Sequence, residues 1–323
     1  MYAIKVKDSG DLSWEEVATP EPKGNEVQIK VHATAINRAD LMQRKGMYPP
    51  PPGASDIMGL ECAGEVMSFG AEVKGFSVGD RVCALLAGGG YSEVVAVDAG
   101  SVLPIPKGLS MEQGAALPEV FATAWLNIFM EAGLQPGEKV ILHAGASGVG
   151  TAAIQLCGAF GSETFVTVGS EDKLSACLGL GATAGSNRHD GSFVDKAKVF
   201  APEGVGVVLD PVGGSYLANN LELLGMGGRL VLIGLMGGMQ TEINLGLMMM
   251  KRLRVIGSTL RARPLLEKAA VMAQLHERVW PKIESGEIRA IVDTVLPVEE
   301  AGAAHDLVAS DKTIGKVILS VPQ

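Results

Sequence analysis

The pattern of apolar and polar positions changes in character along the chain. Up to about residue 118, short alternating or β-branched runs such as EVQIKVHATAI, GEVMSFG and SEVVAV are separated by glycine and proline turns. Alternation with a period of two is typical of strands that bury one face. Residues 1–118 therefore predict a mostly β domain.

From residue 119 to about 261, strand-like runs alternate with helical segments. The strand-like runs are KVILH, TFVTV, GVGVVLD, GGRLVLIG and LRVIGSTL. This alternation predicts an α/β domain of the Rossmann type, a doubly wound parallel sheet with helices on both faces. Residues 262–323 hold a helical stretch, the run IVDTVLPV, a short helix and a last strand KVILSV. We expect them to rejoin the β domain, and we expect a ligand cleft at the carboxyl ends of the parallel strands.

Residues 140–162, VILHAGASGVGTAAIQLCGAFGS, predict a strand, a glycine-rich turn and a helix. Glycines lack a Cβ, so the backbone can turn tightly here and approach a pyrophosphate. The free N–H groups at the helix start favour such an anion. We predict a dinucleotide site at Ser147, Gly148 and Val149, and an ordinary strand-to-helix turn is the alternative.

Composition narrows the class of protein. A net charge of −9 and a pI near 5.2 disfavour nucleic acid as the main partner. The four cysteines are scattered, which indicates neither a disulfide framework nor a cysteine zinc site and fits the reducing cytoplasm. Glycines interrupt the uncharged stretch around residue 150, so no membrane span is predicted.

The run AINRADLMQRKGMYPPPPGASDIMGLECAGEV, residues 35–65, and the run HAGASGVGTAAIQL resemble the zinc-independent quinone oxidoreductases. This zeta-crystallin-like branch belongs to the medium-chain dehydrogenase/reductase superfamily. The resemblance extends to LPEVFATAW, VVLDPVGG, STLRAR and TIGKVIL, and within the branch it points to the tumour-suppressor-inducible NADPH:quinone oxidoreductases. It implies a GroES-like catalytic domain over 1–118 and 262–323, a Rossmann domain over 119–261, and a homodimer joined along the sheet edge at LRVIGSTL.

Two positions differ from the zinc-dependent members of this superfamily. Asn37 stands in place of a ligating cysteine and Leu60 in place of a ligating histidine, and neither side chain is a usual zinc ligand. The resemblance therefore implies an enzyme without a metal. Glu61 keeps the position of a carboxylate beside the metal, and we expect it to be structural and paired with a buried arginine.

The resemblance implies that Asn37, Asp40 and Tyr48 line the pocket of the substrate. Without zinc, alcohol oxidation lacks its Lewis acid, so the substrate is expected to be an electron-poor acceptor. A quinone fits this chemistry. Asn37 can donate an amide hydrogen bond to a quinone oxygen, and Tyr48 offers a phenol donor and an aromatic wall. The alternative for Asp40 is to cap a helix that begins near Leu41. The alternative for Tyr48 is a place in a surface loop.

The end of the run TFVTV favours NADPH over NADH. Gly169 and Ser170 stand where NAD-specific folds place an acidic residue, so nothing there repels a 2′-phosphate. Lys173 follows at a reach suited to that phosphate, and the resemblance places Arg188 where family members often have a tyrosine. Solvated surface charges are the alternative for both. The resemblance implies further cofactor contacts, with core packing or a surface charge as alternatives, at Thr123, Gly234, Leu235, Leu260 and Arg261.

The sequence therefore predicts an NADPH-dependent quinone reductase that transfers hydride, or electrons singly. Reduction of activated alkenes, such as α,β-unsaturated ketones or aldehydes, is the alternative with the same cofactor and cleft. A non-catalytic NADPH-binding module, or an adapter that binds RNA, is the alternative from another class, and the acidic pI weighs against RNA. The triple methionine Met248–Met250 is expected to face the core.

Overall fold

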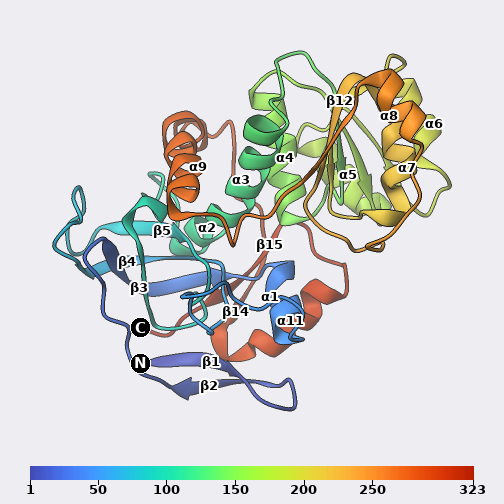
Figure 1. Cartoon of the computed structure of the whole chain (residues 1–323). Helices are drawn as coiled ribbons and strands as arrows, with labels where there is room; N and C mark the ends of the chain where they lie inside the picture. Colours follow the sequence, from blue (N-terminus) through green and yellow to red (C-terminus); the bar gives the residue numbers. More distant parts are fainter. The chain divides into compact units, whose positions relative to one another are not determined.

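The computed structural model describes all 323 residues, which divide into two compact units. Unit 1 comprises Met1–Ala122 and Leu260–Gln323, and unit 2 comprises Thr123–Thr259. The chain thus leaves unit 1 after Ala122 and returns to it at Leu260, where the sequence pattern predicts crossings at residues 118 and 261. Figure 1 shows the elements of each unit.

Unit 2 is built on a six-stranded sheet whose paired neighbours all run parallel. The strand order is β10-β9-β8-β11-β12-β13, so the chain builds outward from β8 in one direction and then from β11 in the other. This is the doubly wound α/β order predicted from the sequence, with its switch point between β8 and β11. The strands are β8 (Val140–His143), β9 (Thr164–Val168), β10 (Ala184–Asn187), β11 (Val205–Asp210), β12 (Leu224–Leu232) and β13 (Arg254–Gly257).

Helices cover both faces of this sheet. Side chains of α6 and α7 share one apolar cluster with Ile141, Phe165, Val208 and Leu230 of the strands, and Figure 1 shows α4 on the opposite side. Residues Gly150–Cys157 of α4 are all buried, so this part of the helix is enclosed on every side. The helices are α4 (Gly148–Ala159), α5 (Glu171–Gly179), α6 (Phe193–Phe200), α7 (Gly214–Leu223), α8 (Leu245–Lys251) and the π-helical turn Leu126–Glu131.

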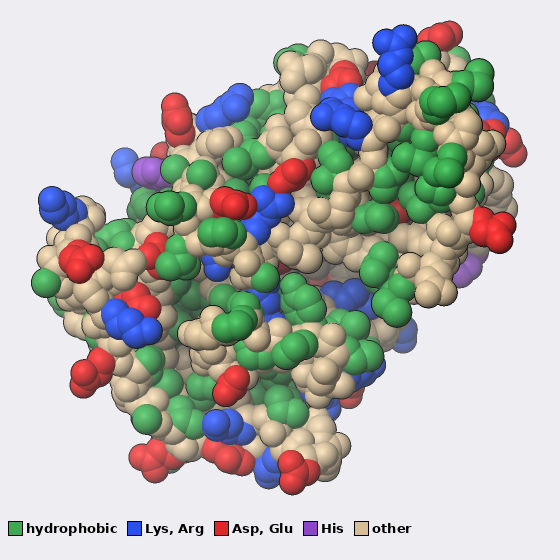
Figure 2. All heavy atoms as spheres, in the orientation of Figure 1, with side chains coloured by type: hydrophobic (Ala, Val, Ile, Leu, Met, Phe, Trp, Pro, Cys, Tyr) green, Lys and Arg blue, Asp and Glu red, His purple; other side chains and the backbone are tan.

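The triple methionine of α8 does not face the core, contrary to the sequence-based expectation. Met249 and Met250 are 76% and 75% exposed, and Met248 is only partly buried. Hydrophobic side chains gather over this part of unit 2 in Figure 2. Three successive helical positions span most of a turn, so one helix packed against one face cannot bury all three.

Unit 1 contains a seven-stranded sheet of order β14-β15-β3-β4-β5-β7, in which β6 also pairs with β3, and a hairpin of β1 and β2. The period-two pattern of β3 is confirmed, because Val27, Ile29 and Val31 are fully buried between partly exposed polar neighbours. The strands are β1 (Tyr2–Val6), β2 (Leu12–Glu16), β3 (Glu26–Ala35), β4 (Glu61–Phe69), β5 (Arg81–Leu85), β6 (Val94–Asp98), β7 (Val102–Pro104), β14 (Val292–Pro297) and β15 (Lys316–Ser320).

Short helices complete unit 1, and one of them begins earlier than predicted. Helix α1 starts at Arg38 with Asn37 as its N-cap residue, so Asp40 lies in its first turn instead of capping a helix near Leu41. No helix of the chain combines the length and the apolarity needed to span a membrane. The helices are α1 (Arg38–Arg44), α2 (Met111–Ala115), α3 (Pro118–Trp125, which enters unit 2), α9 (Leu265–Arg278), α10 (Trp280–Glu284), α11 (Ala301–Ala309) and the 3-10 turns Ala99–Ser101 and Val298–Glu300.

Candidate functional site

The predicted dinucleotide turn of unit 2 connects β8 to α4. Ser147 is the N-cap residue of α4, and its hydroxyl accepts the N–H of Gly150 at 3.1 Å. Gly145 lies so close to β9 that an added Cβ would meet the Val166 side chain at 2.7 Å. An added Cβ at Gly150 would run into the carbonyl oxygens of Gly145 and Ala144. The turn therefore requires glycine at both positions, and the first N–H groups of α4, at Gly148 and Val149, lie at the helix terminus where an anion is favoured.

A buried chain of polar side chains holds the strands together beneath this turn. His143 Nδ1 lies 2.9 Å from the Thr167 hydroxyl, and its Nε2 lies 2.7 Å from Asn220 Oδ1. Asn220 in turn donates to the Asp210 carboxylate at 2.9 Å, which leaves its carbonyl oxygen to accept from His143. Burial lowers the pKa of His143, so the ring is neutral at pH 7. His143 thus has a structural role, and the backbone carbonyl of Thr167 accepts the Gly145 N–H at 2.9 Å.

The residues predicted to face the 2′-phosphate come from the ends of two paired strands. Gly169 and Ser170 follow β9, and the backbone N–H of Arg188, which follows β10, donates to Val168 at 2.8 Å. Arg188 is exposed and its Nε lies 3.4 Å from His189 Nε2. Lys173 lies in the first turn of α5 and is 7% exposed, so most of its side chain is enclosed by protein. The structure thus brings Ser170 and Arg188 together at the carboxyl ends of β9 and β10. Lys173 is more buried than a solvated surface lysine would be.

The other predicted cofactor residues fall into three places. Thr123 is buried in α3, and its backbone carbonyl accepts the Asn127 side-chain amide at 2.8 Å. Gly234 follows β12 and lies so close to β11's end that an added Cβ would meet the Pro211 carbonyl at 2.8 Å. Leu235 next to it is half exposed. Leu260 and Arg261 belong to unit 1.

Arg261 is 5% exposed and is held by the segment that carries Tyr48. Its Nη1 donates to the Tyr48 carbonyl at 3.2 Å, and its Nη2 donates to Gln43 Oε1 at 2.7 Å. Its Nε donates to the Ala87 carbonyl at 2.8 Å. The guanidinium also lies 5.3 Å from the centre of the Tyr48 ring, which is a cation–π distance. Arg261 is therefore not a free surface charge, and it fixes the position of the Tyr48 loop.

Asn37, one of the three predicted acceptor residues, lies among charged side chains. Its Oδ1 accepts from Lys316 Nζ at 2.6 Å, and its Nδ2 donates to Glu61 Oε1 at 2.9 Å. Glu61 is fully buried, and its second oxygen accepts the backbone N–H of Glu119 at 2.9 Å. The expected partner of Glu61 was an arginine. The partner is Lys316, whose Nζ lies 2.8 Å from Glu61 Oε1, and neither charge pattern nor spacing in the sequence pairs these two residues.

Asp40 is fully buried and occupied by donors from its own unit. Its carboxylate accepts the backbone N–H of Asn37 at 2.8 Å, that of Gly59 at 3.2 Å and the Tyr91 hydroxyl at 3.2 Å. Burial raises the pKa of Asp40 to about 6, against the opposing effect of these hydrogen bonds and of Lys316. Tyr91 continues the chain to His305 Nε2 at 3.1 Å. Burial lowers the pKa of His305 to about 4. Asp40 thus anchors the start of α1 to Gly59 and Tyr91. No motif in the sequence pointed to Tyr91 or His305.

Tyr48 is half buried, so its ring is neither a free loop side chain nor part of the core. Burial raises the pKa of Tyr48, Arg261 lowers it and Glu119 raises it. Glu119 therefore lies within electrostatic range of the Tyr48 hydroxyl while its backbone bonds to Glu61. Tyr48 and the Asn37–Glu61–Lys316 cluster both belong to unit 1.

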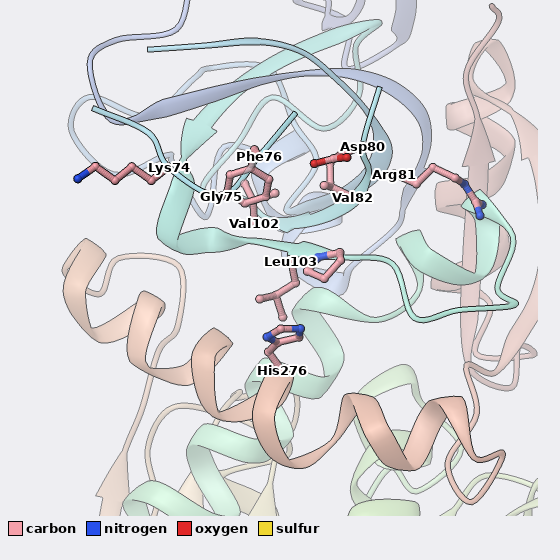
Figure 3. A pocket seen from close by; sticks show the side chains of 10 residues that line it. Lys74, Gly75, Phe76, Asp80, Arg81, Val82, Val102, Leu103 and His276 are labelled. Carbon is pink, nitrogen blue, oxygen red and sulfur yellow. The ribbon is translucent and has the colours of Figure 1, made fainter. Parts of the chain in front are cut away.

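A separate hollow of about 470 Å³ in unit 1 does not have the character of an active site. Figure 3 shows Lys74 and Arg81 at its opposite ends, pointing away from one another, with His276 of α9 below Leu103. Ligand pockets need polar groups that converge on one ligand. We therefore place the candidate site at Asn37 and Tyr48 instead.

Comparison with known proteins gives concordant matches over the whole chain. Residues 23–107 match the family model described as "Alcohol dehydrogenase GroES-like domain", and residues 148–276 match "Zinc-binding dehydrogenase". Quinone oxidoreductase of Rattus norvegicus is 33% identical over 326 residues, covering 99% of this chain and 97% of that protein. The chain belongs to the quinone oxidoreductase branch of the medium-chain dehydrogenase/reductase superfamily. The branch predicted from the sequence is thereby confirmed, as is the combination of a Rossmann and a GroES-like domain.

Two solved structures extend this result. Quinone oxidoreductase of Escherichia coli, complexed with NADPH, is 30% identical, has a TM-score of 0.87 and covers 99% of this chain and 100% of that one. The CurK enoyl reductase is also 30% identical, with a TM-score of 0.85 and 99% coverage of both chains. This chain is an oxidoreductase that shares its fold with reductases of two acceptor classes.

The zinc in one family description does not fit the side chains of this chain. Asn37 and Leu60 stand where zinc-dependent members have a cysteine and a histidine, and Leu60 has no donor atom. The neighbouring carboxylate of Glu61 is occupied by the Lys316 ammonium. No group of three or more histidine, cysteine or acidic side chains is arranged to hold a metal ion. We therefore assign no step to zinc.

Proposed function

We propose that this protein is an NADPH-dependent quinone reductase that works without a metal. The observation that carries the proposal is the cluster of Asn37, Glu61 and Lys316. It holds the Asn37 amide, a hydrogen-bond donor at the position of one zinc ligand of the zinc-dependent members, between two buried charges. The kinship to proteins named quinone oxidoreductase supports the choice of acceptor. A quinone needs no Lewis acid, because its ring delocalises the charge that it receives.

NADPH, when bound, supplies a hydride, and the acceptor takes one proton besides it to give the hydroquinone. The protein orients the acceptor. In this proposal the Asn37 amide donates to one quinone oxygen, and Tyr48 supplies a wall and a hydroxyl donor. Asp40 does not touch the acceptor, because its carboxylate is enclosed and accepts three hydrogen bonds from its own unit. Transfer of electrons singly would use the same contacts, since orientation is the protein's main contribution.

The cofactor contacts are proposed for unit 2. The N–H groups at Gly148 and Val149, together with Ser147, would hold the pyrophosphate. Gly169 and Ser170 would admit the 2′-phosphate, with Lys173 and Arg188 as its cations. Thr123, Gly234, Leu235 and Leu260 would border the nicotinamide. Arg261 is proposed to act through Tyr48, because its guanidinium is already bonded to the Tyr48 loop.

Reduction of activated alkenes is the second candidate, and the similarity to an enoyl reductase favours it. In that reaction a proton must be placed on carbon, which is a harder step than protonating a quinone oxygen. A strong proton donor would then be needed at the site. The Tyr48 hydroxyl is a group available for that role, but burial raises its pKa and so makes it a weaker acid, which counts against this candidate.

A steady-state panel of ortho-quinones, para-quinones and enals with NADPH separates these candidates. We expect quinones to have the highest kcat/KM and the activity to survive exhaustive treatment with a chelator. Enals as the best acceptors would favour the alkene reductase. Stoichiometric zinc whose removal abolishes turnover would refute the metal-free proposal, and binding of NADPH without reduction of any acceptor would point to a non-catalytic module.

We further propose a cytoplasmic homodimer. Strand β13 lies at the edge of the unit 2 sheet, and an unpaired edge must be covered or paired. Exposed apolar side chains of the adjoining α8, Leu245, Met249 and Met250, would be covered in the same interface. All four cysteines are free and buried, which fits a reducing compartment. Sedimentation velocity gives the oligomeric state, and a monomer at micromolar concentration would rule out the dimer.

A further inference from the structure

The ammonium of Lys316 lies in a cage of three oxygens. Its Nζ donates to the Ile36 carbonyl at 2.8 Å and to Asn37 Oδ1 at 2.6 Å, and it lies 2.8 Å from Glu61 Oε1. The Lys316 side chain is 4% exposed and that of Glu61 is 0% exposed. An ammonium has three N–H donors, so all of them are used. Lys316 therefore has no donor left for a substrate, and any effect on the reaction must pass through its neighbours.

The same contacts fix the orientation of the Asn37 amide. Its oxygen faces the Lys316 ammonium, and its nitrogen faces the Glu61 carboxylate. Rotating the amide by half a turn would put N–H groups against the ammonium and an oxygen against the carboxylate. Both contacts would be repulsive, and buried charges make such repulsion strong. An asparagine with neutral neighbours has no comparable preference.

One N–H of Asn37 is left without a good partner in this arrangement. The nitrogen donates to Glu61 at 2.9 Å, and the other acceptor near it is the Ala35 carbonyl at 3.5 Å, which is beyond the usual hydrogen-bond distance. Asn37 is 7% exposed, whereas Asp40, Glu61 and Ala35 around it are fully buried. The N–H that lacks a good partner thus belongs to Asn37, which is not completely buried and can still be reached by a ligand.

We propose that Lys316 and Glu61 are positioning residues that lock the Asn37 amide, so that its second N–H is held ready for an oxygen of the acceptor. This rests on the proposed quinone reductase function. In the zinc-dependent members a metal ion supplies the fixed cation. Here a lysine from β15 supplies it, and the cation acts on the acceptor only through the amide that it orients.

The test is the charge-neutral double variant Lys316→Met with Glu61→Gln, which removes the lock without leaving one buried charge alone. We expect NADPH affinity to stay within about twofold of wild type and kcat/KM for the quinone to fall about tenfold, the value of one net hydrogen bond. The matched control is Arg229→Met with Glu138→Gln, which removes an ion pair of 2.6 Å from unit 2. This control should keep the wild-type kcat/KM. A folded Lys316/Glu61 double variant with wild-type kcat/KM would overturn the proposal.

A second readout does not depend on turnover. With asparagine labelled by ¹⁵N, the side-chain amide of Asn37 should show one protected, downfield-shifted proton in the wild type and lose this signature in Glu61→Gln, which keeps the side-chain shape. An unchanged Asn37 signal in that variant contradicts the lock, even if the double variant does not fold. If the wild type shows the lock but reduces no quinone, the proposed function fails. If it reduces quinones without the lock, only the positioning role fails.

Discussion

The two proposed binding regions are built in opposite ways. In unit 1 the acceptor region is a set of side chains whose buried charges fix one another, as in Asn37, Glu61 and Lys316. In unit 2 the cofactor turn is made by backbone, and its glycines are required because a Cβ would strike neighbouring atoms. The acceptor region should therefore be sensitive to substitutions that change charge, and the cofactor turn to substitutions that add side-chain volume. Four predictions test this contrast, from the largest expected effect to the smallest.

Gly150→Ala should disrupt the cofactor turn. The added Cβ would run into the carbonyl oxygens of Gly145 and Ala144, which belong to the turn itself. We expect NADPH affinity, measured by fluorescence titration, to fall at least about 100-fold, because misplaced N–H groups lose several charge-assisted hydrogen bonds.

The matched control lies in the same helix. An added Cβ at Gly158 meets nothing within 4 Å, so Gly158→Ala should leave NADPH affinity unchanged and stabilise α4 by up to about 1 kcal/mol. Equal affinity in the two variants would mean that volume at the turn is not what matters.

The pH dependence of stability should reveal the two buried titrating groups of unit 1. The pKa of Asp40 rises from 3.8 to about 6 on folding, so its contribution to stability is full below pH 3.8 and is lost as the pH rises through 6. The pKa of His305 falls from 6.5 to about 4, so its contribution is full above pH 6.5 and is lost as the pH falls through 4. Each shift of about two pKa units corresponds to about 3 kcal/mol, and the two dependences oppose each other.

Replacing one of these two groups should reveal the pH dependence of stability that the other group causes. Relative to wild type, the unfolding free energy of Asp40→Asn should rise as the pH increases from 4 to 6, and that of His305→Gln should fall over the same range. Denaturant unfolding at several pH values measures both slopes. Two slopes of the same sign would show that these groups do not titrate as the burial of their side chains implies.

Arg188→Ala and Lys173→Ala should each weaken NADPH more than NADH. A charge-assisted contact with the 2′-phosphate is worth about 1.5 to 3 kcal/mol, so we expect a change of about 10- to 100-fold in the ratio of the two dissociation constants. Lys198→Ala, at an exposed lysine of α6, is the control that should leave this ratio unchanged. An equal loss for both cofactors would show that Lys173 and Arg188 do not recognise the phosphate.

Tyr48→Phe keeps the aromatic wall and deletes one hydroxyl. If that hydroxyl only orients the acceptor, kcat/KM should fall about tenfold and NADPH affinity should not change. Tyr48→Ala, which also removes the surface under the Arg261 guanidinium, should cost more. A loss of about 100-fold or more in the Phe variant would identify the hydroxyl as a proton donor and favour alkene reduction. No change with any acceptor would exclude Tyr48 from the site.

Most of the strands and helices could be predicted, because the local periodicity of hydrophobic residues and the glycine turns specify them. The run TFVTV became β9 and GVGVVLD contains β11, and α4 begins at Gly148 as the glycine turn indicated. Errors arose where one local signal had two interpretations. Asp40 is a common helix cap, but Asn37 occupies that position, and Asp40 accepts the Asn37 N–H from within the first turn.

The sequence by itself determined the two-domain fold, the glycine turn, the lack of zinc ligands at Asn37 and Leu60 and the place of Asn37 and Tyr48 in one short segment. Only the tertiary structure decided which charges meet. Lys316 lies 279 positions from Asn37, and Arg261 lies 213 positions from Tyr48. Hydrophobic periodicity specifies which face of an element is buried, but it carries no information about which distant side chain will share that interior. The chain's return to unit 1 at Leu260 brings both cations, Lys316 and Arg261, to the acceptor region, and these cations set the electrostatics there.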